Sequence, residues 1–155
     1  PNALESFDAQ RVKNVRELKE KHNINLGLHT LSGVNVAEIS PFCRDAVDQY
    51  LKAYINLAPL VGAEWIVVHG GYHFTNCRTI RMQAAIERLK HIAGYAEEKG
   101  VLLLLENLNW EPVLAEVNYM PVTPAETMHF LTEIDSQRCA GPLPPITRIS
   151  CLVSG

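Results

Sequence analysis

Short apolar runs recur along the chain at almost equal intervals, and each ends in a polar residue. The last residues of these runs are His29, His69 and Glu106. The runs before His69 and Glu106 contain no alternating polar positions, which is typical of strands buried on both faces of a parallel sheet. We therefore predict strands over residues 24–30, 64–69 and 101–106.

Apolar residues at helical spacing fill the stretches between these runs. Gly62 follows one such stretch at the place where a C-terminal helix cap belongs. Thr123 and Glu126, with Pro124 between them, form a capping box that begins another helix. The predicted helices cover residues 7–22, 43–62, 77–99 and 123–135. Because strands alternate with helices, we expect right-handed crossovers and a parallel sheet.

The length of the chain limits how much of a barrel it can form. A complete α/β barrel takes roughly 250 residues, whereas this chain has 155. We expect an α/β fold that is a partial (β/α)8 TIM barrel of parallel strands with flanking helices, whose C-terminal half is missing. The carboxyl ends of such strands share one rim, so the side chains of His29, His69 and Glu106 are expected to converge there.

The C-terminal tail departs from this pattern. Another strand is due after residue 135, but residues 139–145 are rich in proline, which lacks the donor that a central strand needs. If residues 138–152 are written in plausible codons and the reading frame is shifted by two nucleotides, the new frame can encode an apolar strand with a histidine-rich end. We assign residues 1–136 to the N-terminal part of the barrel and expect residues 137–155 to be an aberrant tail, produced by a frameshift or an equivalent gene-model error.

Composition narrows the class of protein. The formal net charge of −3 does not suggest a nucleic-acid-binding domain, which usually carries a basic stripe. No run approaches the ~20 apolar residues that cross a bilayer, and the charged N-terminus is unlike a secretory signal. The four cysteines form no C-x-x-C pair, which favours free thiols in a reducing cytoplasm. We therefore expect a cytoplasmic protein.

The residues at the three strand ends are candidate metal ligands. Imidazole nitrogens and a carboxylate oxygen suit Zn²⁺, Mn²⁺ or Fe²⁺, and the carboxylate also favours Mg²⁺. We expect His29, His69 and Glu106 to bind a divalent metal, with Mn²⁺, Mg²⁺ and Zn²⁺ left open. Glu106 is also a candidate catalytic base that takes a proton from the carbon next to a carbonyl, while the metal stabilises the resulting charge.

Polar and aromatic residues near the predicted rim are candidate substrate contacts. Asn107 and Asn109 either hydrogen-bond substrate hydroxyls or shape their loop. His73 follows a Gly-Gly pair and could reach over the mouth of the barrel. Trp110 lies in a long loop, where it either stacks on a sugar face or seals the loop to the barrel.

Three pieces of the sequence carry a resemblance. Leu-Gly-Leu-His29, Ile-Val-Val-His69-Gly70-Gly71 and Leu-Leu-Leu-Glu106-Asn107 occur in the order and at the spacing of the xylose isomerase-like TIM-barrel superfamily. That superfamily includes sugar phosphate isomerases and epimerases and the endonuclease IV type of AP endonuclease. The likeness covers about residues 8–135.

The resemblance implies a position and a role for each residue. His29, His69 and Glu106 match the polar residues after barrel strands two, three and four, and the glutamate serves as metal ligand and acid/base in the epimerases. The expected fold therefore comprises parallel strands 2 to 4 with their helices. The family also has ligands on strands five to eight, which this chain does not supply, so we expect weak metal binding and no turnover.

These observations favour a fragment of a sugar or sugar-phosphate isomerase/epimerase-like protein. Two alternatives stay open: an AP endonuclease-like, metal-dependent phosphodiester hydrolase, which the acidic charge disfavours, and a non-catalytic sugar-binding barrel. The expected partner is a small sugar or sugar phosphate, with no nucleic acid and no membrane. A homo-oligomer is left open. Because a half barrel leaves two sheet edges unpaired, we also expect poor solubility.

Overall fold

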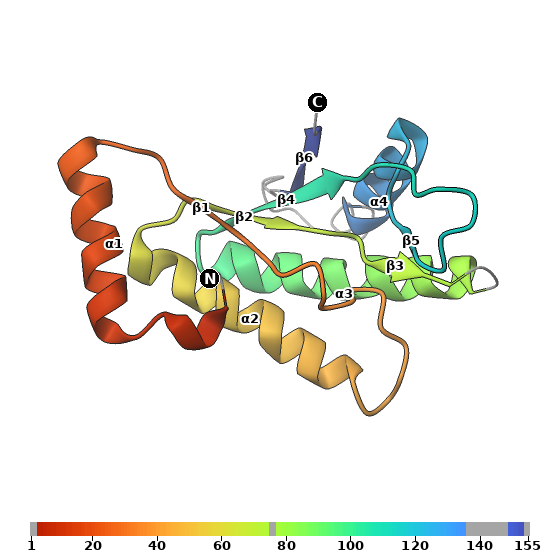
Figure 1. Cartoon of the computed structure of the whole chain (residues 1–155), viewed down its shortest axis with the longest axis horizontal. Coiled ribbons are helices and arrows are strands. Elements are labelled where there is room, and N and C mark those ends of the chain that lie inside the picture. Colours follow the sequence, from red (N-terminus) through yellow and green to blue (C-terminus); the bar gives the residue numbers. More distant parts are fainter. Residues whose placement is uncertain (1–2, 75–76, 136–148, 154–155) are drawn as a thin grey trace, which may run out of the picture.

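The structure is a computed structural model that describes residues 3–74, 77–135 and 149–153. Helices and strands alternate along most of the chain (Figure 1). In order, the elements are η1 (Leu4–Ser6), α1 (Ala9–His22), β1 (Gly27–His29), α2 (Arg44–Val61), β2 (Trp65–Val68), β3 (Tyr72–His73), α3 (Arg78–Glu98), β4 (Leu102–Asn107), β5 (Asn118–Tyr119), α4 (Pro124–Asp135) and β6 (Ile149–Val153).

The main sheet is parallel and has the strand order β1-β2-β4-β6. Leu28 pairs with Ile66 and Ile66 with Leu103, so neighbouring strands run in register. Figure 1 shows α2 and α3 lying along the same side of this sheet. This arrangement confirms the predicted partial barrel, with parallel strands and flanking helices.

Side-chain burial distinguishes the two faces of the sheet. In β4, Leu103 and Leu105 are almost wholly buried in the cluster that also contains α2 and α3 residues, whereas Leu102 and Leu104 are only partly buried. Because successive side chains of a strand point to opposite faces, one face packs on the helices and the other is less covered. The sequence pattern predicted burial on both faces, and the second face differs because the described part of the chain forms only part of the wall.

Local sequence signals explain where the helices begin and end. The carboxylate of Asp8 accepts the N–H of Arg11 at 2.7 Å and caps α1. Gly62 adopts φ 75° and ends α2 as predicted. Thr123 Oγ1 accepts the N–H of Glu126, whose carboxylate accepts the N–H of Val122, so the predicted capping signal is present at α4.

Two features were not predicted. The segments after β2 and β4, expected as loops, form a short antiparallel ribbon in which Tyr72 pairs with Tyr119. The expected aberrant tail contains β6, which runs parallel to β4. The proline-rich residues 139–145 lie outside the described residues, and the frameshift stays a prediction. Within the described residues, none of the helices has the length and apolarity needed to cross a membrane.

Candidate metal centre

The backbone register places the three predicted ligands on one face of the sheet. His29 pairs with Val67, and Val67 pairs with Leu104. His69 lies two residues after Val67 and Glu106 two residues after Leu104, so all three side chains share a face by the twofold period of a strand. That face is the one opposite the buried side chains of Ile66 and Leu103.

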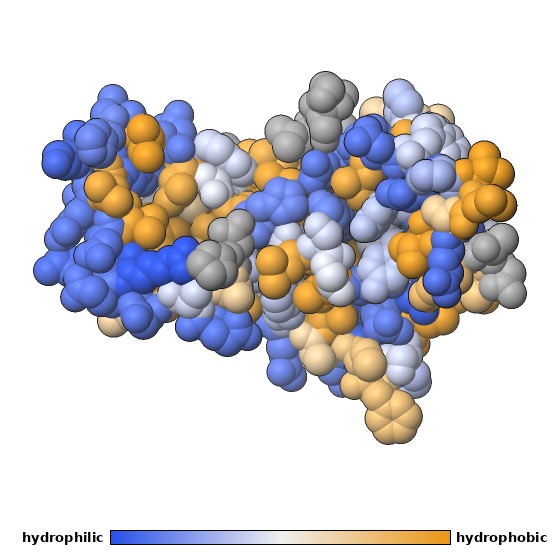
Figure 2. Space-filling model, viewed as in Figure 1, coloured by the Kyte–Doolittle hydropathy of each residue, from blue (hydrophilic) through white to orange (hydrophobic). Residues whose placement is uncertain are grey.

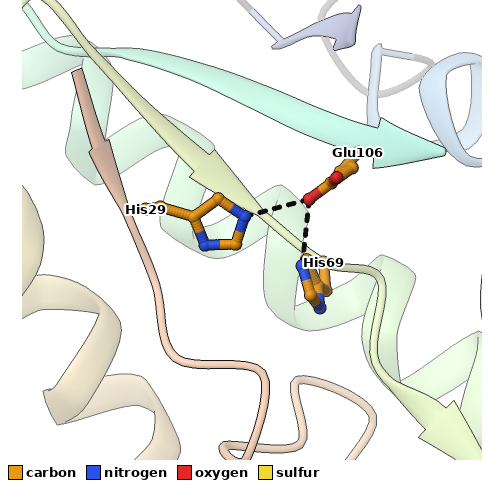
Figure 3. Close-up of side chains that lie close together, drawn as sticks. All are labelled: His29, His69 and Glu106. Atoms are coloured by element: carbon orange, nitrogen blue, oxygen red, sulfur yellow. Dashed lines mark hydrogen bonds and ion pairs between the residues drawn. The ribbon is translucent and has the colours of Figure 1, made fainter. Parts of the chain in front are cut away.

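The three side chains meet at the ends of β1, β2 and β4 (Figure 3). The Nε2 atoms of His29 and His69 each lie 3.0 Å from Oε2 of Glu106. One ligand atom from each residue lies within 4.8 Å of the others. Among the described residues, this is the one group of three or more His, Cys, Asp or Glu side chains close enough to share an ion.

The ring of His29 is held in one orientation by the backbone of the next residue. Its Nδ1 atom lies 2.6 Å from the carbonyl oxygen of Thr30. A carbonyl can only accept, so Nδ1 carries the hydrogen and, in the neutral ring, Nε2 presents a lone pair to the Glu106 carboxylate. Two acceptors at 3.0 Å are stable together only when a proton lies between them, carried by the ring or by the carboxyl group, or when a cation does.

His69 is more buried, with 11% of its side chain exposed. Burial lowers its pKa, and the positive potential of His29 acts in the same direction, while the Glu106 carboxylate opposes the shift. The net direction is downward, so the neutral ring is favoured, and a neutral imidazole is the form that binds metals. Its buried Nδ1 atom has no hydrogen-bond partner among the described residues.

These donors fit a divalent metal. Ligands about 2.1 Å from a common ion lie roughly 3–3.5 Å apart, and two of the separations here are 3.0 Å. Two imidazoles and a carboxylate form a mixed donor set suited to Zn²⁺ or Mn²⁺. The Nε2 lone pair of His29 faces the Glu106 carboxylate, and a cation between these two acceptors would bind both.

An open pocket of about 280 Å³ is lined by two of the predicted substrate contacts, His73 and Trp110. None of the three candidate ligands lines it, but Tyr119 does, and its ring contacts His69. His73 is 7% exposed, and its Nδ1 donates to the carbonyl of Phe74. Trp110 is 72% exposed, which leaves its indole available to a ligand. Figure 2 shows apolar side chains gathered over the loop between β4 and β5, where Val113 and Leu114 are also exposed.

The two predicted asparagines lie in different surroundings. The Oδ1 atom of Asn107 accepts the hydroxyl of Thr127 at 2.8 Å, which ties the end of β4 to α4. Asn109 is exposed and does not line the pocket. Their role as substrate contacts stays a prediction.

Sequence reasoning missed Tyr119. Its ring meets the ring of His69 edge-on at 6.3 Å between centroids, and it also lines the pocket beside His73. The residue lies in a loop without periodicity, so only its pairing with Tyr72 brings it to the centre. The sequence offers no signal for that pairing.

Solved structures with a similar fold include several sugar epimerases. A D-psicose 3-epimerase with D-tagatose from Clostridium cellulolyticum H10 matches with a TM-score of 0.74 and 16% identity over 97% of this chain and 50% of that one. A D-tagatose 3-epimerase-like protein matches with a TM-score of 0.72 and 20% identity over 94% and 51%. A D-allulose 3-epimerase from Methylomonas sp. matches with a TM-score of 0.69 and 18% identity over 97% and 48%.

The chain thus spans about half the length of the solved structures it resembles. No curated protein matches its sequence. Residues 1–142 match the sequence model of one protein family, described as the xylose isomerase-like TIM barrel. That match covers most of the chain and agrees with the parallel sheet and the similar solved folds, so the chain belongs to the xylose isomerase-like TIM barrel family.

Proposed function

We propose that the chain is the N-terminal part of a sugar or sugar-phosphate isomerase/epimerase-like protein that uses a divalent metal. One observation carries the proposal: two imidazoles and one carboxylate gather within 4.8 Å at the ends of three neighbouring parallel strands. The shared fold with sugar 3-epimerases supports this choice of reaction class.

The reaction moves a proton on a carbon next to a carbonyl. A metal held by His29, His69 and Glu106 would polarise that carbonyl and stabilise negative charge beside it. Glu106 is the group that takes and returns the proton, because it is the carboxylate of the cluster and its side chain is 17% exposed. Both imidazoles contact its Oε2 atom and fix the direction in which the carboxylate points.

We place the substrate in the pocket that Tyr119 lines, because the ring of Tyr119 contacts His69 of this cluster. Trp110 offers an apolar face for the carbon skeleton, and His73 borders the same space. Asn107 and Asn109 remain proposed partners for hydroxyl groups. The chain supplies three ligands, whereas its resemblance implies more on later strands, so we expect the isolated chain to bind metal weakly and to turn over no substrate.

The paramagnetic effect of Mn²⁺ on the NMR relaxation of a ketose tests the proposal, and this measurement does not require turnover. The chain is mixed with Mn²⁺ and D-fructose, and the relaxation rates of the sugar protons are measured by NMR. We expect faster relaxation than with Mn²⁺ alone, because the sugar binds next to the ion. His69→Ala and Glu106→Ala should each abolish the increase.

His91→Ala provides the matched control, since His91 lies on α3 and is not part of the cluster. This variant should relax the sugar as the unchanged chain does. If the unchanged chain gives no increase over free Mn²⁺, or if the cluster variants retain it, the proposed function is wrong.

A further inference from the structure

A buried carboxamide joins the two loops that follow the histidine ligands. Asn35 lies in the segment after β1 and is 6% exposed. Its Nδ2 donates to the carbonyl of Tyr72 at 3.1 Å, and its Oδ1 accepts the N–H of Tyr72 at 2.9 Å. The side chain therefore pairs with both polar backbone groups of Tyr72, as a neighbouring strand would.

The same oxygen also stabilises its own loop. Asn35 Oδ1 accepts the N–H of Ala37 at 3.0 Å. Gly71 packs directly on this turn, because a Cβ atom at Gly71 would lie 2.5 Å from the nitrogen of Ala37 and 2.7 Å from Asn35 Oδ1. The two loops are therefore in backbone contact, and a larger residue at position 71 would separate them.

Helix α3 holds the loop from the other side. The guanidinium of Arg88 donates to the carbonyls of Val36 and Glu38 and to the carboxylate of Asp48. Arg81 donates to the carbonyl of Ala37 at 3.1 Å. Two arginines of α3 thus bind three consecutive carbonyls of the loop. These bonds fix the position of the loop, and therefore the position from which Asn35 bonds to Tyr72.

The connection continues to the metal centre. Tyr72 pairs with Tyr119, and the N–H of Met120 donates to the carbonyl of Gly71. The ring of Tyr119 lies edge-on to His69. A displacement of Tyr72 would therefore shift His69 in two ways. It would move the backbone segment that follows His69, and it would move the Tyr119 ring that packs on the His69 ring.

We propose that Asn35 is a positioning residue for the metal centre, which sets the place of His69 by joining the loop after His29 to the segment after His69. This inference rests on the proposed function in so far as the cluster binds a metal. Asn35 itself touches neither the ligand atoms nor the pocket that we assign to substrate.

The variant Asn35→Leu tests the role, because leucine has a similar volume and makes no hydrogen bonds. Ile92→Ala is the matched control, since Ile92 is fully buried on α3 and its side chain cannot hydrogen-bond to the loop. Both variants lose stability. We expect only Asn35→Leu to lower the Zn²⁺ affinity measured by calorimetry, by about tenfold.

Two metal-free measurements separate this inference from the proposed function. Asn35→Leu should speed hydrogen exchange of the Tyr72 amide relative to the global rate and shift the ring resonances of His69, and Ile92→Ala should do neither. If the unchanged chain binds no Zn²⁺, the proposed function fails, and these two readouts alone decide the role of Asn35. An unshifted His69 ring in Asn35→Leu overturns the inference.

Asn35→Asp covers the case in which Asn35→Leu does not fold. Aspartate keeps an oxygen that can accept the Ala37 and Tyr72 N–H groups, but it loses the donor to the Tyr72 carbonyl and, when ionised, sets a negatively charged oxygen against that carbonyl. In Asn35→Asp we expect hydrogen exchange at the Tyr72 amide to remain slower than in Gly71→Ala. We also expect a measurable shift of the NMR resonances of the His69 ring. Identical His69 resonances in Asn35→Asp and the unchanged chain contradict the proposal.

Discussion

The rings of His29 and His69 meet edge to face, with centroids 5.1 Å apart and an interplanar angle of 89°. This arrangement directs one nitrogen of each ring at the same oxygen of Glu106. One ligand atom from each of the three residues lies within 4.8 Å of the others, so the proposed ligands would need little rearrangement to bind an ion.

Metal addition is therefore expected to stabilise the fold. An ion that binds only the folded chain adds about 2.7 kcal/mol at a concentration 100 times its Kd. Zn²⁺ or Mn²⁺ should raise the melting temperature of the chain, and EDTA should reverse the rise. This rise in melting temperature should disappear in His29→Ala and in His69→Ala. If both variants show the same rise as the unchanged chain, the ion binds elsewhere.

Arg88→Ala is expected to be strongly destabilising. Its side chain is 7% exposed and its Nε atom lies 2.6 Å from Asp48 Oδ1, so truncation leaves a carboxylate and two carbonyls without their donor. Loss of one partner of a fully buried pair costs about 3–5 kcal/mol. The Asp48 side chain is 33% exposed and water can partly replace the lost donor, so we expect a loss of about 2–3 kcal/mol, which urea denaturation can measure. Arg16→Ala, which removes an exposed pair with Glu20, should cost no more than about 0.5 kcal/mol.

Gly71→Ala should destabilise the chain and disturb the metal centre. Gly71 adopts φ 92°, which L-residues rarely accept, and its Cβ position is occupied by the backbone of Ala37. Strain of this kind costs about 1–3 kcal/mol. Gly33→Ala is the control, since a Cβ atom there meets nothing within 4 Å. Equal melting temperatures for the two variants would contradict the prediction.

Glu38 should contribute a pH-dependent part of the stability. Burial raises its pKa, but the N–H groups of Ser40 and Ile39 and the nearby Arg81 and Arg88 outweigh burial, so the pKa is lowered from 4.5. A carboxyl whose folded pKa is depressed stabilises the fold above its unfolded pKa and loses this contribution as the pH falls through the folded value.

Unfolding free energies measured from pH 6 downward check this contribution. Glu38→Gln should be less stable than the unchanged chain near neutral pH, and the difference should shrink in acid. A difference that stays constant below the usual pKa of glutamate would show that the charge of Glu38 is not involved.

The sequence predicted the parts of the molecule that depend on local periodicity. The positions of β2 and β4, the cap at Gly62 and the capping box at Thr123 follow from residue type and spacing alone. The convergence of His29, His69 and Glu106 follows from the rule that parallel strands end at one rim.

What the sequence could not predict depends on contacts between distant segments. The pairing of Tyr72 with Tyr119 and the bond from Asn35 to Tyr72 involve single residues in loops, where no repeating pattern exists. The strand β6 follows a proline-rich stretch that locally argues against a strand. The predicted substrate contacts at Asn107 and Asn109 depend on a ligand whose position no local rule determines.

The proposed metal ligands and the proposed substrate contact Trp110 are carried by different kinds of backbone. His29 belongs to a strand whose place is fixed by its pairing with β2, whereas Trp110 lies in the long connection between β4 and β5. Insertions or replacements in that connection can change which molecules are accepted and leave the spacing of the three ligand atoms intact. The architecture would thereby allow selectivity to diversify without any change in the proposed metal centre.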